Sequence, residues 1–188
     1  MHFAPDTAAS LEFAVEFANT DVSASASGGD ELASVGDLLG LLDRWEFSGS
    51  RDETAAELAA VRASRDRMRL VWSTIARGDT DAAVAEVNAM LADARALPRL
   101  ARHDGSPWHL HATTPDAPLA QRIEVEGALA LVDVIRSNET GRLRVCAADD
   151  CAGLLVDLSR NGSKRYCSVR CGNRMNQLAF RERRQAGD

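Results

Sequence analysis

All four cysteines of this 188-residue chain lie near its C-terminus, in two close pairs. Four residues separate Cys146 from Cys151, three separate Cys167 from Cys171, and fifteen lie between the pairs. Two short knuckles that each supply two thiolates are typical of a tetrahedral structural Zn²⁺ site. Two disulfides are the alternative interpretation. The spacing favours one structural zinc ion held by all four cysteines.

The composition supports a metal site rather than disulfides. The chain begins without the basic segment and apolar stretch of a secretory signal, and it has no apolar run near the about 20 residues that span a bilayer. We therefore expect a cytoplasmic protein without a membrane segment. Thiols stay reduced in the cytosol, where paired cysteines bind metal more often than they form disulfides.

The charge is divided unevenly along the chain. Residues 1–140 hold 12 Lys and Arg against 23 Asp and Glu, whereas residues 141–184 hold 10 against 4. The net charge of −6 therefore combines an acidic body with a basic C-terminal segment. A basic tail on an acidic body indicates a polyanionic partner, although a solvated basic surface gives the same count.

The spacing of apolar residues predicts a mainly α-helical first domain, residues 1–140. Its strongest helix covers 52–77, with Trp72 on the apolar stripe. Other helices are expected from about 11 to Asn19, over 32–47, from an N-cap at Thr80 to 96, and over 119–137, the last closed by Gly141.

A short β-hairpin is expected over 99–111, turning at Asp104-Gly105. It would place Trp108 and Leu110 on one face and His109 and His111 on the other. Two histidines on one face could bind a metal. A solvated or structural pair is the favoured interpretation, because no third ligand lies near them in sequence.

The second domain, residues 141–188, is expected to be a small treble-like ββα zinc finger. Strands are predicted at 153–157 and 164–167, followed by a helix from Cys171 to about Arg184. About forty residues bury too little apolar area to fold well alone, so the metal would supply the missing stability.

The last helix carries the candidate nucleic-acid contacts. Arg170, Arg174, Gln177, Arg181 and Arg184 are spaced to share one helical face. Asn173, Asn176 and Gln177 are candidates for base contacts, and Lys164 and Arg165 for phosphate contacts. Val169, Met175, Leu178 and Phe180 are expected to pack against the finger. Asn173 and Arg174 could instead brace the knuckle.

The tetrapeptide Cys171-Gly172-Asn173-Arg174, preceded by Arg-Tyr-Cys-Ser, resembles the fourth-ligand motif of the CGNR zinc-finger family. These bacterial proteins join a C-terminal finger to a helical N-terminal domain called ABATE. Residues 11–20, LEFAVEFANT, resemble the opening of that domain, with Phe17 in place of a leucine. Tyr166 stands where many relatives have tryptophan. The resemblance implies a stress-induced transcriptional regulator.

Three classes of function follow. The leading hypothesis is a DNA-binding transcription regulator whose N-terminal domain forms a homodimer or senses an unidentified small-molecule effector. The alternative is an interaction adaptor whose basic finger docks on an acidic partner or on its own acidic domain. An enzyme is least expected, because four thiolates leave zinc no open position and no catalytic motif is present.

Overall fold

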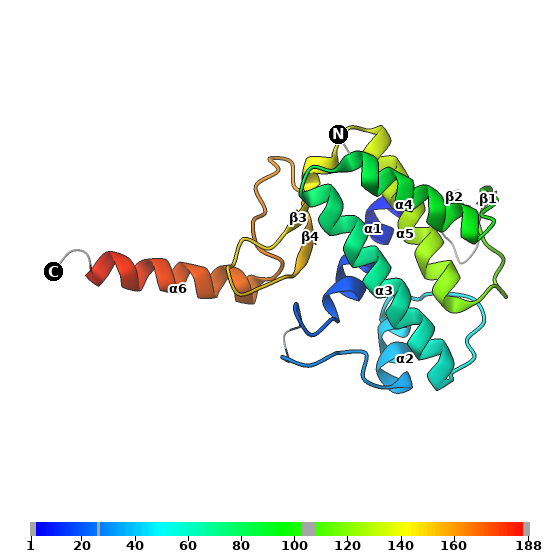
Figure 1. Cartoon of the computed structure of the whole chain (residues 1–188), viewed down its shortest axis with the longest axis horizontal. Coiled ribbons are helices and arrows are strands. Elements are labelled where there is room, and N and C mark those ends of the chain that lie inside the picture. The colour runs from blue at the N-terminus through cyan, green and yellow to red at the C-terminus, as the bar shows by residue number, and fades with distance from the viewer. Residues whose placement is uncertain (1–2, 26, 103–107, 186–188) are drawn as a thin grey trace.

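The computed structural model describes residues 3–25, 27–102 and 108–185. Five helices build the body, and a sixth extends away from it (Figure 1). The body helices are α1 (Pro5–Asn19), α2 (Val35–Arg44), α3 (Ala55–Ala76), α4 (Thr80–Asp93) and α5 (Leu119–Arg136). The other elements are strands β1 (Arg99–Ala101), β2 (His109–His111), β3 (Leu143–Val145) and β4 (Leu154–Val156), the 3-10 turn η1 (Thr140–Arg142), and α6 (Val169–Gln185). The mainly helical fold with small β-hairpins confirms the predicted class.

Apolar stripes on α1, α3, α4 and α5 meet to form the larger core. Trp72 of α3 is fully buried at its centre. A second cluster joins α2 to the second half of α1, the first half of α3 and the start of α5, around Phe13, Phe17 and Leu42. Burial of apolar area at about 25 cal/mol per Å² is the main stabilising contribution to such a body.

Several helix boundaries differ from the sequence-based expectation, and single residues at three of them show the cause. Helix α2 starts only at Val35, because Ser34 and Asp37 form a capping box there. The N-cap of α4 is Asp79, whose carboxylate accepts from the backbone N–H of Ala82, so Thr80 is already helical. Beyond α5, Asn138 adopts the left-handed conformation (φ 58°) that Gly141 was expected to supply.

The strands β1 and β2 pair antiparallel, with Leu100 opposite Leu110. Trp108 and Leu110 are exposed, whereas His109 and His111 are half-buried on the other face, as predicted. The expected turn at Asp104-Gly105 lies outside the described residues.

The predicted strand pairing of the finger is wrong. β4 pairs antiparallel with β3, not with residues 164–167, which form an irregular loop. Arginine side chains replace a strand ladder there: Arg142 donates to the carbonyls of Asp157 and Ser159, and Arg144 to those of Gly162 and Lys164. Backbone acceptors bonded in this way need no partner strand.

The β3–β4 hairpin is packed into the helical body. Leu143, Leu154 and Val156 are buried in the same cluster as residues of α1, α3 and α5. The side chain of Asn19, at the end of α1, donates to the carbonyl of Leu154 (2.9 Å) and accepts from its N–H (2.7 Å). The proposed domain boundary at residue 140 stays a prediction, and the hairpin beyond it shares the core of the body.

Arg69 of α3 makes a second connection between the body and the finger. Its guanidinium donates to the carbonyls of Ala18 (2.7 Å) and Ala152 (3.1 Å). The segment of residues 27–31, near this contact, is anchored by the buried Arg65, which bonds both carboxylate oxygens of Asp30. The hydrogen bond from Arg65 holds the pKa of Asp30 at about 2. The base of the finger is therefore fixed to the body by side chains of α1 and α3.

Replacement of Asn19 by alanine is expected to loosen this junction. The change leaves both backbone groups of the buried Leu154 without their partner, which costs about 2 kcal/mol of unfolding free energy. Denaturant unfolding would measure this loss, and amide exchange at Leu154 would locate it. Asn161→Ala, in the exposed turn of the same finger, should stay within about 0.5 kcal/mol of the parent protein. Equal effects of the two substitutions would contradict the assigned role of Asn19.

Candidate metal centre and basic helix

The four cysteine sulfurs converge on one point. They lie within 4.8 Å of one another, with Sγ–Sγ distances of 3.7 Å for Cys151–Cys167 and Cys167–Cys171 and 3.8 Å for Cys151–Cys171. A tetrahedral zinc ion with Zn–S bonds of about 2.3 Å requires edges of about 3.8 Å. A disulfide needs about 2.05 Å, and all four cysteines are free thiols. The donor set therefore fits one structural Zn²⁺.

Local backbone contacts place each sulfur. Cys146 follows β3, and its N–H donates to the carbonyl of Gly153 (2.7 Å), which closes the first knuckle. In the second knuckle Ser168 caps α6: its hydroxyl accepts from the N–H of Cys171 (3.2 Å). Cys171 therefore lies in the first turn of α6, where the positive end of the helix dipole stabilises a thiolate.

The surroundings of the sulfurs suit bound thiolates. The N–H of Gly153 points to Cys151 Sγ (3.4 Å), and the N–H of Cys167 to Cys146 Sγ (3.5 Å). Burial raises the pKa of the Cys151 and Cys167 thiols. A coordinated divalent cation overcomes that cost, because metal-bound thiols are deprotonated. The knuckle thus needs the ion for its four sulfurs to ionise together.

Arg174 braces the knuckle. One guanidinium nitrogen contacts Asp150 in the first knuckle and the other approaches Cys171 Sγ at 3.8 Å in the second. The two halves of the site are thereby linked by one side chain. Asn173 is exposed on α6 and belongs to a different face. Of the two residues in question, Arg174 has the bracing geometry.

Gly153 was not recognised as a site residue from the sequence. A Cβ atom there would lie 2.7 Å from Cys167 Sγ and 3.2 Å from Cys151 Sγ. The sulfurs therefore occupy space that only glycine leaves open. The nearest sequence signal is its position two residues after Cys151.

The Gly153→Ala substitution is expected to weaken zinc binding by about ten- to a hundredfold, as loss of support around metal ligands does. Competition with a chromogenic chelator would measure the change. Gly141→Ala is the matched control, because a Cβ at residue 141 meets nothing within 4 Å. A zinc affinity for Gly153→Ala equal to that of the control would rule out the steric argument.

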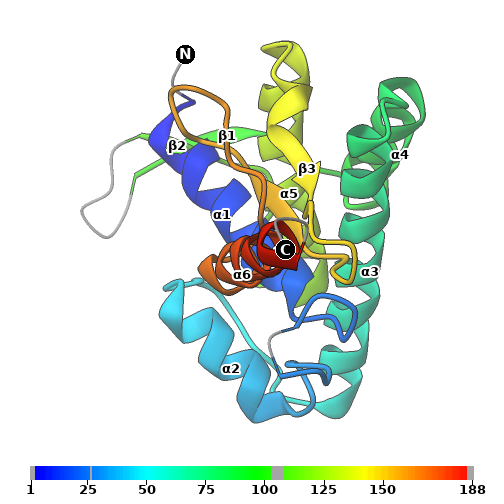
Figure 2. The same cartoon turned by 90° about the vertical axis from the view of Figure 1, so that its left-hand side faces the viewer.

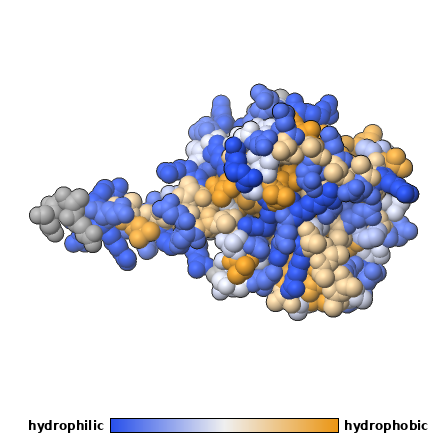
Figure 3. All heavy atoms as spheres, in the orientation of Figure 1, coloured by the Kyte–Doolittle hydropathy of each residue, from blue (hydrophilic) through white to orange (hydrophobic). Residues whose placement is uncertain are grey.

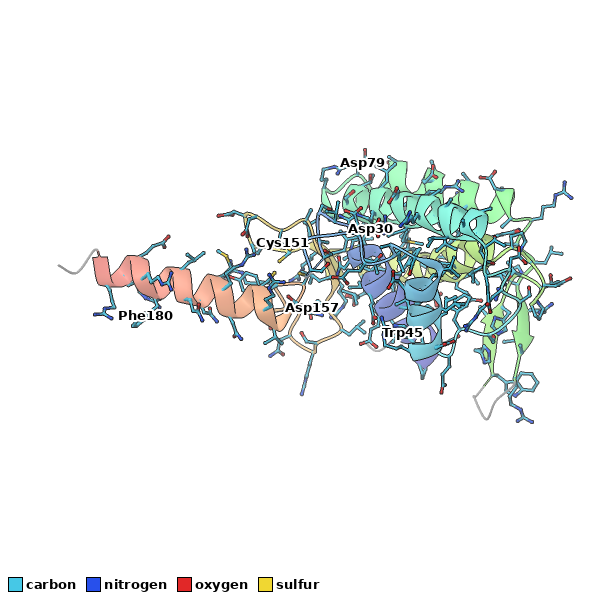
Figure 4. The ribbon with its side chains drawn as sticks, turned by 90° about the horizontal axis from the view of Figure 1, so that it is seen from below. Asp30, Trp45, Asp79, Cys151, Asp157 and Phe180 are labelled. Atoms are coloured by element: carbon cyan, nitrogen blue, oxygen red, sulfur yellow. The ribbon has the colours of Figure 1, made fainter. Side chains whose placement is uncertain are left out.

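Helix α6 projects from the body beyond its first turns (Figures 1 and 2). Figure 4 shows Phe180 on this projecting part, far from Cys151 and Asp157 at the junction. The expected packing of Val169, Leu178 and Phe180 against the finger is wrong. The exposed fractions of these three side chains are 80%, 43% and 54%, because the helix extends past the finger's small core. Of the four apolar residues predicted to pack against the finger, Met175 is the one that does.

One face of α6 brings together all three predicted base-contact residues. A shallow hollow along the helix is lined by Asn173, Asn176, Gln177, Phe180, Arg181 and Arg184. The space-filling view shows this arm as mostly hydrophilic, with apolar residues among the polar ones (Figure 3). Three amide groups are therefore followed by two guanidinium groups along a solvent-exposed face.

The other predicted contact residues lie near the body. Lys164, Arg170 and Arg174 line a groove between the finger and α1, opposite Glu12 and Glu16. Lys164 Nζ also donates to the carbonyl of Val156 (3.3 Å). Arg165 lies on the exposed loop, over the ring of Tyr166. The predicted set thus divides into an outer group on the projecting part of α6 and an inner group on the first turns of α6 and the loop before it.

The two histidines of the β1–β2 hairpin form a polar chain. Their Nε2 atoms are 3.1 Å apart, and Nδ1 of His111 is 2.9 Å from Glu126 of α5. Among the described residues, the cysteines are the one group of three or more potential ligands close enough to share an ion. The histidine pair therefore has the geometry of a structural contact.

The fold and the site define a class of protein in which a helical body is joined to a four-cysteine zinc finger. Comparison with known families identifies the family. The chain matches the ABATE family, described as "Putative stress-induced transcription regulator", over residues 11–157, and the CGNR zinc finger over 142–184. The chain belongs to the ABATE family and carries a C-terminal CGNR zinc finger with one structural zinc. No match was found among curated proteins. In the described part of the chain, no helix is long and apolar enough to cross a membrane.

Proposed function

We propose that this protein is a cytoplasmic DNA-binding transcription regulator, in which zinc fixes the knuckle that holds α6 for insertion into DNA. One observation carries the proposal: α6 leaves the body as a projecting helix, with amide and guanidinium side chains along an exposed face. With 17 residues, α6 is about 25 Å long and suits the major groove, which admits one helix.

The distribution of charge supports this role. Body arginines such as Arg65 and Arg67 are paired with carboxylates. In the described residues, Arg181 and Arg183 of α6 form no ion pair. The two side chains therefore present their positive charge to solvent, where the phosphate groups of DNA would contact them. Gln177 and the two asparagines can bond adenine edges, and arginine can bond guanine.

A single basic helix provides modest affinity. About six phosphate contacts typically give micromolar, salt-sensitive non-specific binding. Specific recognition is therefore expected from a homodimer that presents two α6 helices to two half-sites. The zinc ion is structural in this proposal, because the four thiolates complete its tetrahedron and leave no position for substrate.

An interaction adaptor is the second candidate, favoured by the exposed Val169 and Leu178 on α6. Apolar side chains on a projecting helix are suited to a protein groove. Docking of α6 on the protein's own acidic body is not the arrangement in this structure, where the helix extends away from it (Figure 1).

Genomic footprinting of the full-length protein tests the proposal, with Cys171→Ser as the control. We expect discrete protected sites with the parent protein and none with the variant, whose fourth zinc ligand is missing. Absence of protected sites with the parent protein, together with no DNA binding at low salt, would favour the adaptor.

A further inference from the structure

A cleft of about 860 Å³ lies in the helical body, away from the zinc site. Its walls come from the first half of α1, from α5, from the loop after α2 and from the β1–β2 hairpin. The volume is within the range of small-molecule sites. Trp45 of the body, labelled in Figure 4, borders this cleft and also the groove between α1 and the finger.

Two walls of the cleft supply its apolar side chains. Ala9 and Phe13 come from α1, and Leu129 and Val132 from α5. Phe13 is stacked against Phe47, with ring centroids 5.3 Å apart, so this part of the wall is a fixed aromatic surface. A ligand that fills the cleft therefore needs an apolar or aromatic body.

The hairpin supplies the polar end. Arg99, Ala101, His109 and His111 all line the cleft, and Arg99 is opposite His111 in the strand register. A carboxylate only accepts hydrogen bonds, so His111 donates from Nδ1 to Glu126. The contact fixes the orientation of the imidazole beside Arg99.

Arg99 is the cation at this end of the cleft, and no carboxylate of the described residues pairs with it. Within the described residues it makes no ion pair, whereas Glu126 is bonded to His111 and Asp133 accepts from Thr7 (2.6 Å). Arg122 is buried and already bonds the carbonyls of Ser48, Ser50 and Ala117. Arg99 therefore keeps its guanidinium donors available at the hairpin end, whereas the Glu126 and Asp133 carboxylates already accept from His111 and Thr7.

The charges in the rest of the cleft are mixed, with carboxylates of Asp6, Glu46 and Asp133 beside the guanidinium group of Arg136. Arg136 lies ten residues beyond Glu126 on α5, which is about 15 Å along the helix. Asp6 of α1 lines the cleft with it and carries the opposite charge. The place for an acid group is thus the hairpin end, where Arg99 can donate hydrogen bonds to it.

We propose that this cleft binds a small amphipathic acid, with its apolar or aromatic body between α1 and α5 and its acid group at Arg99. The inference rests on the proposed function in one respect, which is that the bound acid acts as the effector of the regulator. Helix α1 connects the cleft to the finger, because its first half lines the cleft and Asn19 at its end forms hydrogen bonds with Leu154 of β4.

Two fluorescent probes with similar aromatic bodies test the inference on the zinc-loaded, full-length protein without DNA. They are anilinonaphthalene sulfonate, an anion, and N-phenylnaphthylamine, which is neutral. Arg99→Gln should weaken binding of the anion about tenfold, as loss of one charge-assisted contact does, and leave the neutral probe unchanged. Arg102→Gln, on the same hairpin with Arg102 over Trp108, should change neither.

A second pair of variants locates the bound probe. Ala9 is exposed on the cleft wall, so Ala9→Trp should fill the cleft and abolish binding of both probes, whereas Ala63→Trp on the exposed side of α3 should not. Equal effects of Arg99→Gln and Arg102→Gln, or unchanged binding by Ala9→Trp, would overturn the inference. Because DNA is absent, these outcomes are independent of whether the protein binds DNA.

Discussion

Removal of zinc is expected to unfold the outer part of the finger and leave the helical body folded. The β3–β4 hairpin should remain, because Leu143, Leu154 and Val156 are buried in the core of the body. Helix α6 should lose most of its helicity, since its first turn depends on Cys171 and an isolated 17-residue helix is marginal in water. Structural zinc and folding are linked in small modules of this kind.

Far-UV circular dichroism and limited trypsin digestion, before and after chelation, measure this change. Cleavage is expected after the basic residues between 158 and 185, with a core ending near residue 157 that resists digestion. The Cys171→Ser variant should resemble the chelated protein and change little on further chelation. Full helicity and resistance of α6 after zinc removal would contradict a metal-dependent finger.

Loss of the two arginines on the outer face of α6 is expected to abolish most DNA affinity. In Arg181→Ala/Arg184→Ala, two phosphate-neutralising groups disappear, so the slope of log affinity against log salt should fall by about 2. Fluorescence anisotropy with a labelled duplex, at several salt concentrations, gives both quantities. The fold and zinc content should be unchanged, because both side chains are exposed.

The matched control removes two exposed arginines elsewhere. Arg102→Ala/Arg160→Ala changes the net charge by the same amount but leaves α6 intact. The control should keep nearly the parent affinity and salt slope. Similar losses in the two double variants would mean that net charge, and not the position of α6, governs binding.

The cysteine spacing predicted the metal centre because a zinc site is a local chemical requirement. The strand pairing of the finger was missed for a physical reason: Arg142 and Arg144 were counted as surface charge, yet they bond loop carbonyls and take the place of a strand. A sequence reports that an arginine is present but not which acceptor it reaches. The same limit applies to the predicted arginine face of the last helix, because Arg174 turns toward Asp150.

Asn19 illustrates the same limit. Its sequence context carried the family resemblance, but its role depends on Leu154, 135 residues away, which no local pattern reveals. Gly153 is similar, because its requirement arises from sulfurs brought together by folding. The presence of the helices was predictable from the spacing of apolar residues, whereas the positions of their ends depend on single capping residues such as Ser34 and Asp79.

Chemical-shift mapping of the isotope-labelled, zinc-loaded protein during titration with duplex DNA tests the central claim most directly, and its 20.2 kDa mass permits residue-level spectra. The largest changes are predicted in α6, at the amide groups of Asn173, Asn176 and Gln177, with the body helices nearly unaffected. Changes confined to the body or the β1–β2 hairpin, or no changes at low salt, would contradict a DNA-binding α6.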